Sequence, residues 1–482
     1  MFDLRPVVYV IGLVVAVLGV TMLLPMMVDL FFGRPDWTVF LQSAIITVTF
    51  GAAMSIATAN GVGGGLSVQQ TFLLTTLIWV ALPLFGALPF IFGEIQARPV
   101  DAIFEAMSGL TTTGSTVFSG LDAMPEGLLV WRSMLQWFGG IGIIVVAMVF
   151  LPELRVGGMQ IFRSEAFDTM GKVLPRAAEI AGRITWIYLA LTILNVLAYL
   201  LVGMTPFDAI NHAFTTMSTG GFSTHDASFG VYQGAPEYVA AVFMILASLP
   251  FVRYIQLVAG TAQPLFRDSQ IRAYLGTILV ITLVMTIYRL VANGDHFEHG
   301  FREGVFNVTS IMSGTGYASV DYQLWGTFPI VAFFFLGLIG GCAGSTACSV
   351  KIFRYQILIA AIRARIMQIL APHGVFTPRF EGRPISEAVL SSVMAFFVMF
   401  VVSLGILAVL LSMTGLDMVT SLSGAATAIA NIGPGLGDTI GPSGNFATLN
   451  DTAKWLLTAA MLVGRLELLS VYVLFTMRFW RG

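Results

Sequence analysis

The sequence predicts an all-α integral membrane protein: two N-terminal transmembrane helices followed by fourfold pseudo-symmetric repeats of helix, re-entrant loop and helix. Composition is the first observation, since 57% of the 482 residues are apolar and 10% are charged, whereas soluble domains carry roughly 25% charged residues. The second is a series of ten apolar runs, most of them at or above the about 20 residues needed to cross a bilayer. The third is a short glycine- and hydroxyl-rich segment that recurs four times between such runs.

The ten apolar runs mark the predicted transmembrane helices. The first has no small-residue cleavage site after it, so we expect a retained span rather than a removed signal peptide. The runs cover residues 7–32, 38–58, 70–93, 128–150, 185–203, 236–260, 274–292, 325–350, 386–413 and 452–477. Four shorter stretches of helical character lie between pairs of runs and cannot cross a bilayer: 102–110, 206–216, 301–312 and 418–430. We interpret them as re-entrant half-helices.

These elements divide the chain into five parts. We expect a two-helix leader over residues 1–66 and four repeats over residues 67–155, 156–265, 266–370 and 371–482. Non-helical backbone at membrane depth is tolerated only where it lines a cavity or is buried in protein. Four units that each contain such backbone must therefore surround a wet path.

Each half-helix leads into one copy of the recurring segment. The copies are aligned on Gly114, Gly220, Gly316 and Gly433, with spacings of 106, 96 and 117 residues. A near-regular spacing is the mark of an internal repeat. One copy alone would be better explained by close packing of small residues between helices, but four copies in the same position between spans favour a pore.

The recurring segments contain ligands that suit an alkali cation. A half-helix that ends at mid-membrane presents the negative end of its dipole, and glycine adopts positive φ at little cost, so four such loops can form rings of carbonyl oxygens. Neutral hydroxyl and amide oxygens add to these, and there is no carboxylate cage for a divalent ion. The candidate cation ligands are Thr112, Thr113, Gly114, Ser218, Thr219, Gly220, Gly314, Thr315, Gly316, Asn431, Ile432 and Gly433.

The distribution of charge predicts the orientation. Sixteen of the 24 lysines and arginines lie in one set of loops and at the termini, which marks the cytoplasmic side. Acidic residues dominate the opposite side, where the half-helices enter, so the entrance faces outward and concentrates cations. The net charge of −2 gives no indication of a nucleic-acid partner.

The second long helix of each repeat contains a weak point near its middle. Glycine or proline in a helix interior tends to kink or break the helix. The weak points are residues 139–142, Pro250, residues 337–345 and Gly464. Close helix packing is the alternative explanation for the first, second and fourth. The third is too glycine-rich for a continuous helix, so we expect a mobile loop within the membrane.

Arg465 is a charged residue inside an otherwise apolar run. A charge at the bilayer centre costs about 2.5–3.5 kcal/mol on insertion scales, so Arg465 must face water or a partner. Glu467 is two residues away and points to another side of the helix. Arg465 is therefore either a cation in the pore or half of an ion pair with another helix. Arg253 lies closer to a helix end, from which it can extend to the membrane surface.

Other site classes find little support. Cys342 and Cys348 share one glycine-rich segment and form neither a disulfide framework nor a zinc-ligand set, so we interpret them as packing residues. The five histidines are scattered, and no metal set, serine–lysine pair or aspartate dyad at useful spacing indicates a membrane-embedded enzyme.

The four recurring segments, the run from Trp131 to Gly142 and the run from Gly340 to Thr346 together closely resemble the Trk/Ktr/HKT superfamily of potassium transporters. The two extra N-terminal helices are similar to the TrkH/TrkG branch. The resemblance implies a potassium-channel-like fold and potassium uptake across the bacterial inner membrane. It implies potassium as the transported ion, with no organic cofactor on this chain.

The resemblance also implies partners and roles. It implies a homodimer in membrane lipid, with one pore per chain, gated by a cytoplasmic ring of TrkA-type nucleotide-binding subunits. The implied gate is an intramembrane loop that includes Gly340, Gly341, Gly344 and Ser345, with Arg465 as a barrier below the filter. Residues 347–349 depart from the relatives, which often have a further glycine pair there. A sodium-coupled or mixed sodium/potassium transporter remains the alternative, and the choice between channel-like and proton-coupled flux is open.

Overall fold

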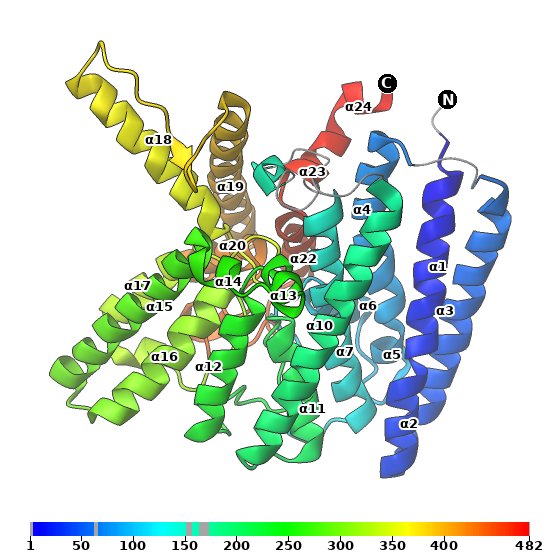
Figure 1. Cartoon of the computed structure of the whole chain (residues 1–482). Coiled ribbons are helices and arrows are strands. Elements are labelled where there is room, and N and C mark those ends of the chain that lie inside the picture. Colours follow the sequence, from blue (N-terminus) through cyan, green and yellow to red (C-terminus); the bar gives the residue numbers. More distant parts are fainter. Residues whose placement is uncertain (1–2, 62–65, 151–156, 163–172, 482) are drawn as a thin grey trace.

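The computed structural model describes residues 3–61, 66–150, 157–162 and 173–481. Within this part, seven helices are long and apolar enough to span a membrane, and nine if each of two bent helix pairs counts as one span. The helices pack into one bundle, with both termini on the same side (Figure 1). The predicted all-α membrane architecture is confirmed.

The leader is a helical hairpin. Its helices are α1 (Arg5–Thr21), α2 (Leu23–Phe32) and α3 (Trp37–Thr58), followed by a 3-10 turn (Ala59–Gly61). Small residues let α1 and α3 approach closely, since a Cβ atom at Gly12 would lie 2.6 Å from Ser55 Oγ and 2.7 Å from Gly51 O.

The next stretch of chain places a short helix between two long ones. It consists of α4 (Val68–Gly86), α5 (Leu88–Phe92), α6 (Pro99–Leu110), a 3-10 turn (Leu121–Ala123), α7 (Glu126–Val145), a π-helical continuation (Val146–Phe150) and a 3-10 turn (Met159–Phe162). Ser67 and Gln70 form a capping box that begins α4. The indole of Trp131 donates to Gly86 O at 2.8 Å and ties α7 to α4.

The same order of elements follows with a sharp break. The helices are α10 (Val173–Leu201), α11 (Pro206–Met217), α12 (Ala235–Ala247) and α13 (Phe251–Val258). The axes of α12 and α13 differ by 89°. Pro250 lies at this break, where it lacks the N–H that a continuous helix would use.

The third such stretch contains the longest interruption. Its elements are α14 (Gln263–Arg267), α15 (Ser269–Tyr288), a π-helical turn (Arg289–Asn293), α16 (Phe297–Ser313), a 3-10 turn (Tyr322–Trp325), α17 (Thr327–Gly337) and α18 (Ile352–Leu370). The predicted span over 325–350 is wrong, because the helix ends at Gly337 and irregular backbone continues to α18. Helix α18 projects beyond the bundle on the side of the termini (Figure 1).

The last stretch begins with a small hairpin. Strands β1 (Arg379–Phe380) and β2 (Arg383–Pro384) pair antiparallel, with Arg379 opposite Pro384. The helices that follow are α19 (Glu387–Met413), α20 (Met418–Ala430), α21 (Gly437–Ile440), α22 (Asp451–Arg465) and α23 (Leu469–Tyr472), then a 3-10 turn (Val473–Phe475) and α24 (Met477–Arg481). The chain bends by 104° after α22, where Glu467 and Leu468 take positive φ.

Most predicted helices are confirmed. Seven of the ten runs are single apolar helices, the runs 236–260 and 452–477 are the bent pairs, and the four half-helices are α6, α11, α16 and α20. The weak point at 139–142 does not break α7, which continues to Val145, so packing explains it. A Cβ atom at Gly139 would overlap Leu110 O, and one at Gly140 would lie 2.9 Å from Ser218 Cα.

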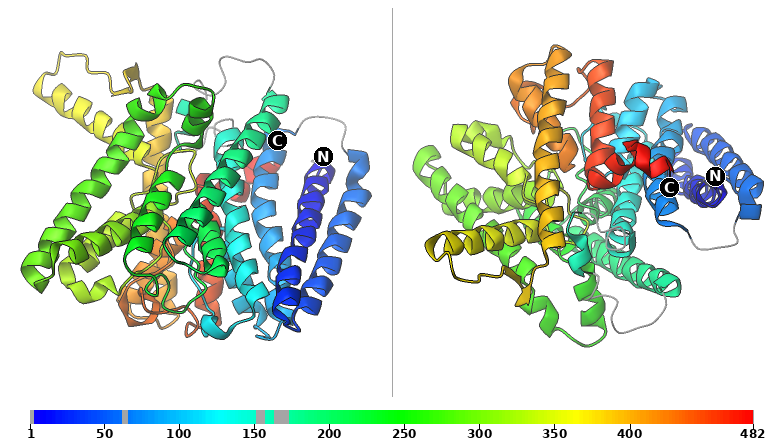
Figure 2. Two further views of the ribbon diagram at one scale, coloured as in Figure 1. Left: turned by 60° about the horizontal axis from the view of Figure 1, so that its bottom comes forward. Right: turned by 90° about the horizontal axis from the view of Figure 1, so that it is seen from above.

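The leader lies at the edge of the bundle, and the other stretches follow one another around its centre (Figure 2). The proposed boundary between residues 155 and 156 falls outside the described residues. So do three of the basic loop residues used for orientation, Arg155, Arg163 and Lys172.

Candidate functional site

The four loops that follow the short helices share one backbone conformation. In each loop, the first or second residue after the helix takes positive φ, and so does a glycine two positions later. The first set is Thr112 (52°), Thr219 (52°), Gly314 (78°) and Asn431 (54°), and the second is Gly114 (85°), Gly221 (76°), Gly316 (79°) and Gly433 (101°).

This conformation corrects the alignment of the second loop. The counterpart of Gly114 is Gly221, whereas the sequence alignment used Gly220, which is one residue early. The hydrogen bonds agree, because Thr113 N donates to Ser108 O and Gly220 N donates to Thr215 O, each five residues back. Two adjacent glycines are indistinguishable by composition, and only the backbone angles separate them.

The four loops touch one another in closed order. A Cβ atom on Gly114 would overlap Gly220 O, and one on Gly221 would overlap Thr315 O. A Cβ atom on Gly316 would overlap Ile432 O, and one on Gly433 would lie 3.0 Å from Thr113 O. Each loop therefore meets the next, and the fourth meets the first, so the loops surround a common axis.

Several carbonyl oxygens of these loops have no hydrogen-bond donor. Among the described residues, no donor reaches the carbonyls of Thr113, Thr315 or Ile432. The same holds for the carbonyls of Thr112, Thr219, Gly314 and Asn431. These residues are buried. Buried carbonyls are normally paired, and a dehydrated alkali cation is the partner that such a ring of oxygens suits.

The predicted side-chain ligands are largely engaged within the protein. Asn431 Nδ2 donates to Thr113 Oγ1 at 2.9 Å and to Met461 O at 2.9 Å. Thr219 Oγ1 donates to Ser218 O at 2.7 Å, and Ser218 Oγ to Thr215 O at 3.2 Å. The backbone oxygens are therefore better candidate ligands than the hydroxyl and amide groups.

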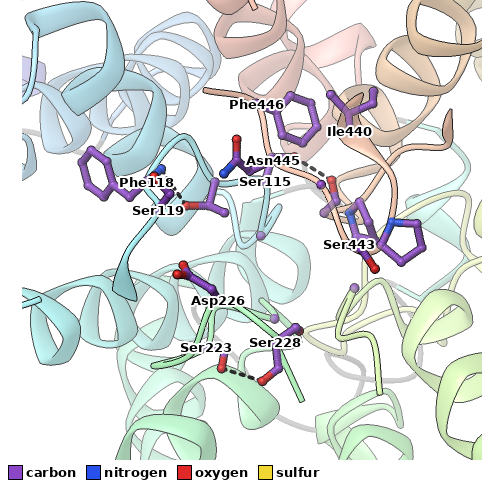
Figure 3. A pocket seen from close by; sticks show the side chains of 18 of the residues that line it. Ser115, Phe118, Ser119, Ser223, Asp226, Ser228, Ile440, Ser443, Asn445 and Phe446 are labelled. Carbon is purple, nitrogen blue, oxygen red and sulfur yellow. Dashed lines mark hydrogen bonds between the residues drawn. The ribbon is translucent and has the colours of Figure 1, made fainter. Parts of the chain in front are cut away.

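A cavity of about 510 Å³ opens on one side of the four glycines. Gly114, Gly221, Gly316 and Gly433 line it, together with residues from several stretches of the chain. Figure 3 shows Ser115, Asp226 and Asn445 around this space. Acidic and basic side chains both reach its wall.

The wall of the cavity is fastened across the loops. Asp226 accepts hydrogen bonds from Gly120 N at 2.9 Å and Leu121 N at 3.1 Å. His225 Nδ1 lies 2.5 Å from Asp122 Oδ1, and this hydrogen bond is the main reason that the pKa of Asp122 lies below its usual value. These contacts join the loop after α6 to the loop after α11.

The irregular segment between α17 and α18 lies on the other side of the glycines. Cys348 N donates to Ser313 O at 3.3 Å and Ser349 N to Ala430 O at 2.9 Å, which are carbonyls at the ends of α16 and α20. Thr112 Oγ1 lies 3.6 Å from Cys348 Sγ. The prediction of a loop at 337–345 is confirmed, and its mobility stays a prediction.

The four predicted gate residues hold this loop in shape. Gly344 takes positive φ (71°) and its carbonyl accepts from Phe251 N at 2.9 Å. Gly340 N donates to Val350 O at 2.8 Å, and Ser345 Oγ donates to Cys342 O at 2.7 Å. A Cβ atom on Gly341 would lie 2.6 Å from Ala347 Cβ.

Arg465 contacts the same loop. Its Nη1 donates to Cys348 Sγ at 2.8 Å and to Thr346 O at 3.4 Å, while Nη2 lies 3.5 Å from Gly139 O. The side chain is buried, and its Nε has no partner among the described residues. In that part of the chain no carboxylate pairs with Arg465.

The neighbouring charges pair elsewhere. Glu467 forms an ion pair with Arg354 at the start of α18. Arg253 pairs with Asp268, with Nε 2.7 Å from Oδ2, and its predicted extension to the membrane surface stays a prediction.

Sequence reasoning missed the polar side chains of α7. Arg132 and Gln136 are one turn apart and buried. Arg132 Nε lies 2.8 Å from Glu105 Oε1 on α6. The available signal was a charge and an amide at i, i+4 in an apolar span, opposite a carboxyl on a half-helix.

Comparison with known proteins gives concordant results. The family model TrkH, described as a cation transport protein, matches residues 37–481. The potassium uptake protein TrkI of Halomonas elongata is 43% identical over 99% of this chain and 97% of its own length. The potassium uptake protein TrkH of Escherichia coli K12 is 35% identical over 99% of both chains. The crystal structure of the potassium transporter TrkH from Vibrio parahaemolyticus covers 100% of both chains with a TM-score of 0.92 and 33% identity.

Proposed function

Because the chain belongs to the TrkH family of cation transport proteins, we propose that it takes up potassium across the bacterial inner membrane. The family is one of transporters and not of enzymes. The single observation that supports the ion path is the closed ring of loops, with four positive-φ glycines in contact with neighbouring carbonyls and with buried carbonyl oxygens that lack donors.

The selectivity filter in this proposal is built from the four loops. Rings of backbone oxygens replace the water around a potassium ion, and the ligands come from residues 112–114, 219–221, 314–316 and 431–433. The cavity of about 510 Å³ is the outer vestibule, and the acidic residues on that side attract cations.

The gate in this proposal is the loop between α17 and α18 together with Arg465. The loop lies against the ends of α16 and α20, and Arg465 adds a positive charge to the same place. In this conformation the loop obstructs the path below the filter. Opening requires the loop to leave its hydrogen bonds to Ser313, Ala430, Ala247 and Ser248.

The partners in this proposal follow the names of the relatives, which belong to Trk systems. We expect a homodimer whose outer helices contact lipid, with the filter entrance facing outside. A TrkA-type subunit binds on the side of the termini, where α18 projects with exposed Arg363 and Arg365.

Growth of potassium-uptake-deficient bacteria tests the function. The chain, expressed with its TrkA-type partner, restores growth at limiting potassium and takes up rubidium. Isotope flux under imposed sodium or proton gradients separates simple potassium conduction from sodium-coupled or mixed transport. If growth is rescued neither with a homologous partner nor with a foreign one, the proposal is contradicted.

A further inference from the structure

We propose that Gln136 is a positioning residue that sets ion selectivity from outside the filter. Its amide on α7 holds the second filter strand, residues 220–223, which belongs to the next stretch of chain. This inference rests on the proposed function, because it assigns a selectivity role within the same pore.

Gln136 binds the strand on both sides of Gly221. Its Nε2 donates to Gly220 O at 2.7 Å, and its Oε1 accepts from Phe222 N at 3.0 Å. The side chain is fully buried, so water cannot replace either bond. The amide therefore fixes the two peptide groups that flank the glycine of positive φ.

The bond explains why residue 220 is also glycine. Its φ is not positive, so conformational freedom is not the reason. A Cβ atom there would overlap the amide of Gln136, with Nε2 at 2.8 Å. The two glycines serve different purposes: Gly221 permits the backbone angle, and Gly220 makes room for Gln136.

This contact makes the four strands unequal. Gly220 O is equivalent in position to the carbonyls of Thr113, Thr315 and Ile432, since each lies against the glycine of a neighbouring loop. Among the described residues only Gly220 O of these four accepts a hydrogen bond. A hydrogen bond from an N–H donor fixes the direction of this oxygen and draws electron density from it. Gln136 therefore controls how Gly220 O binds an ion in the ring.

Arg132 supports the same strand one helical turn away. Its Nη1 donates to Ser223 O at 2.9 Å, and its guanidinium lies 4.3 Å from the ring centroid of Phe222. Arg132 holds the outer end of the strand, whereas Gln136 holds the carbonyl at the level of the ion path. Removal of Gln136 therefore loosens the ring while the strand stays attached.

The test is rubidium uptake and its inhibition by sodium in the full-length protein with its partner. Gln136→Met keeps the length of the side chain and removes both bonds. We expect about a three- to tenfold loss of rubidium-over-sodium discrimination, from the net value of one or two hydrogen bonds, with protein abundance kept. Gln69→Met is the control, because Gln69 Nε2 also donates to a backbone carbonyl, Phe479 O at 3.1 Å, far along the chain from the filter.

A second pair of variants separates positioning from general stability. Gly220→Ala keeps the Gln136 amide chemically intact, but the new methyl group displaces it. We therefore expect the same loss of discrimination. Adding Gln136→Ala makes space for the new methyl group, so the double variant should be no worse than Gln136→Ala alone. Independent structural damage would instead add the two losses.

The outcomes are distinct. If the wild type discriminates between rubidium and sodium, and both Gln136→Met and Gly220→Ala discriminate equally well, the inference is overturned. A wild type without potassium uptake overturns the proposed function itself. If Gln136→Met does not accumulate, Gly220→Ala decides alone, because the Gln136 amide stays chemically intact in it.

Discussion

A single methyl group is enough to probe the proposed filter, because the four filter glycines of positive φ have little or no room for a side chain. A Cβ atom on Gly114 would overlap Gly220 O, and one on Gly316 would overlap Ile432 O. A non-glycine residue in the left-handed region also costs about 1–2 kcal/mol. The steric and conformational penalties can be separated, since other glycines of positive φ lie in open space.

We expect Gly114→Ser, and equally Gly221→Ser, to lower discrimination between potassium and sodium, because each displaces one carbonyl of a shared ring. The loss should be about tenfold, which corresponds to about 1.4 kcal/mol. Gly120→Ser is the matched control: Gly120 has φ of 75°, but a Cβ atom there meets nothing within 4 Å. Wild-type ion ratios in Gly114→Ser, measured by competitive flux, would show that the filter assignment is wrong.

The same residues show where sequence reasoning stops. Glycine and hydroxyl repeats were sufficient to find four loops, because few other segments of a membrane span have that composition. They could not place the register of the second loop, since Gly220 and Gly221 differ only in φ and in their neighbours. Nor could they show that the side-chain amide of Asn431 donates a hydrogen bond to Thr113 Oγ1.

At the scale of elements, the half-helices were predictable and the breaks were only partly so. Length decided the half-helices, since 12 to 17 residues cannot cross a bilayer. Glycine content did not decide the breaks: the glycines at 139–142 lie inside a continuous helix, whereas α22 ends at a sharp bend marked by the positive φ of Glu467 and Leu468. Whether a glycine breaks a helix depends on what packs against it, which is a property of the fold.

In the proposed gate, the loop between α17 and α18 and the end of α22 form one obstruction, and Arg465 is its charged part. Two unit charges about 8 Å apart repel by roughly 2 kcal/mol at an effective dielectric near 20, which corresponds to about thirtyfold in rate. We therefore expect Arg465→Ala to increase rubidium uptake without loss of selectivity. Reduced uptake together with loss of detergent-stable protein would indicate that Arg465 has a structural role instead.

Shortening the loop tests the other part of the obstruction. Deletion within residues 340–345 should also raise uptake, because it removes the hydrogen bonds from Cys342 N to Ser248 O and from Phe251 N to Gly344 O, which hold the loop in place. Combined with Arg465→Ala, it should give less than the product of the two separate increases, since Arg465 and the loop meet at Cys348. A fully multiplicative increase would place them at two separate barriers.

At the scale of the whole molecule, side-chain contacts join the four stretches to one another around the proposed ion path. Ion pairs cross two of the boundaries between stretches: Lys454 with Asp101 at 2.6 Å, which is partly buried, and Arg302 with Glu237, which is buried. Asp226 and Gln323 cross the others by hydrogen bonds to backbone groups. Contacts on every side would keep the proposed filter fixed. We therefore expect control by a partner to act on parts outside it, and α18 directly follows the proposed gate loop.

Helix α18 is therefore where we expect a regulatory subunit to act. It begins at Ile352, directly after the gate loop, and it projects on the side of the termini (Figure 1). Arg354 near its start pairs with Glu467, two residues beyond Arg465, so a displaced α18 pulls on both parts of the obstruction.

Joint charge reversal, Arg363→Glu with Arg365→Glu, should weaken co-purification with a TrkA-type partner about tenfold and lower partner-dependent uptake. The pair Arg267→Glu with Arg272→Glu is the control, because both side chains are exposed on another segment. If both double variants bind the partner as strongly as the wild type does, this part of α18 is not in the interface. The proposed gate would then have to respond through a different surface.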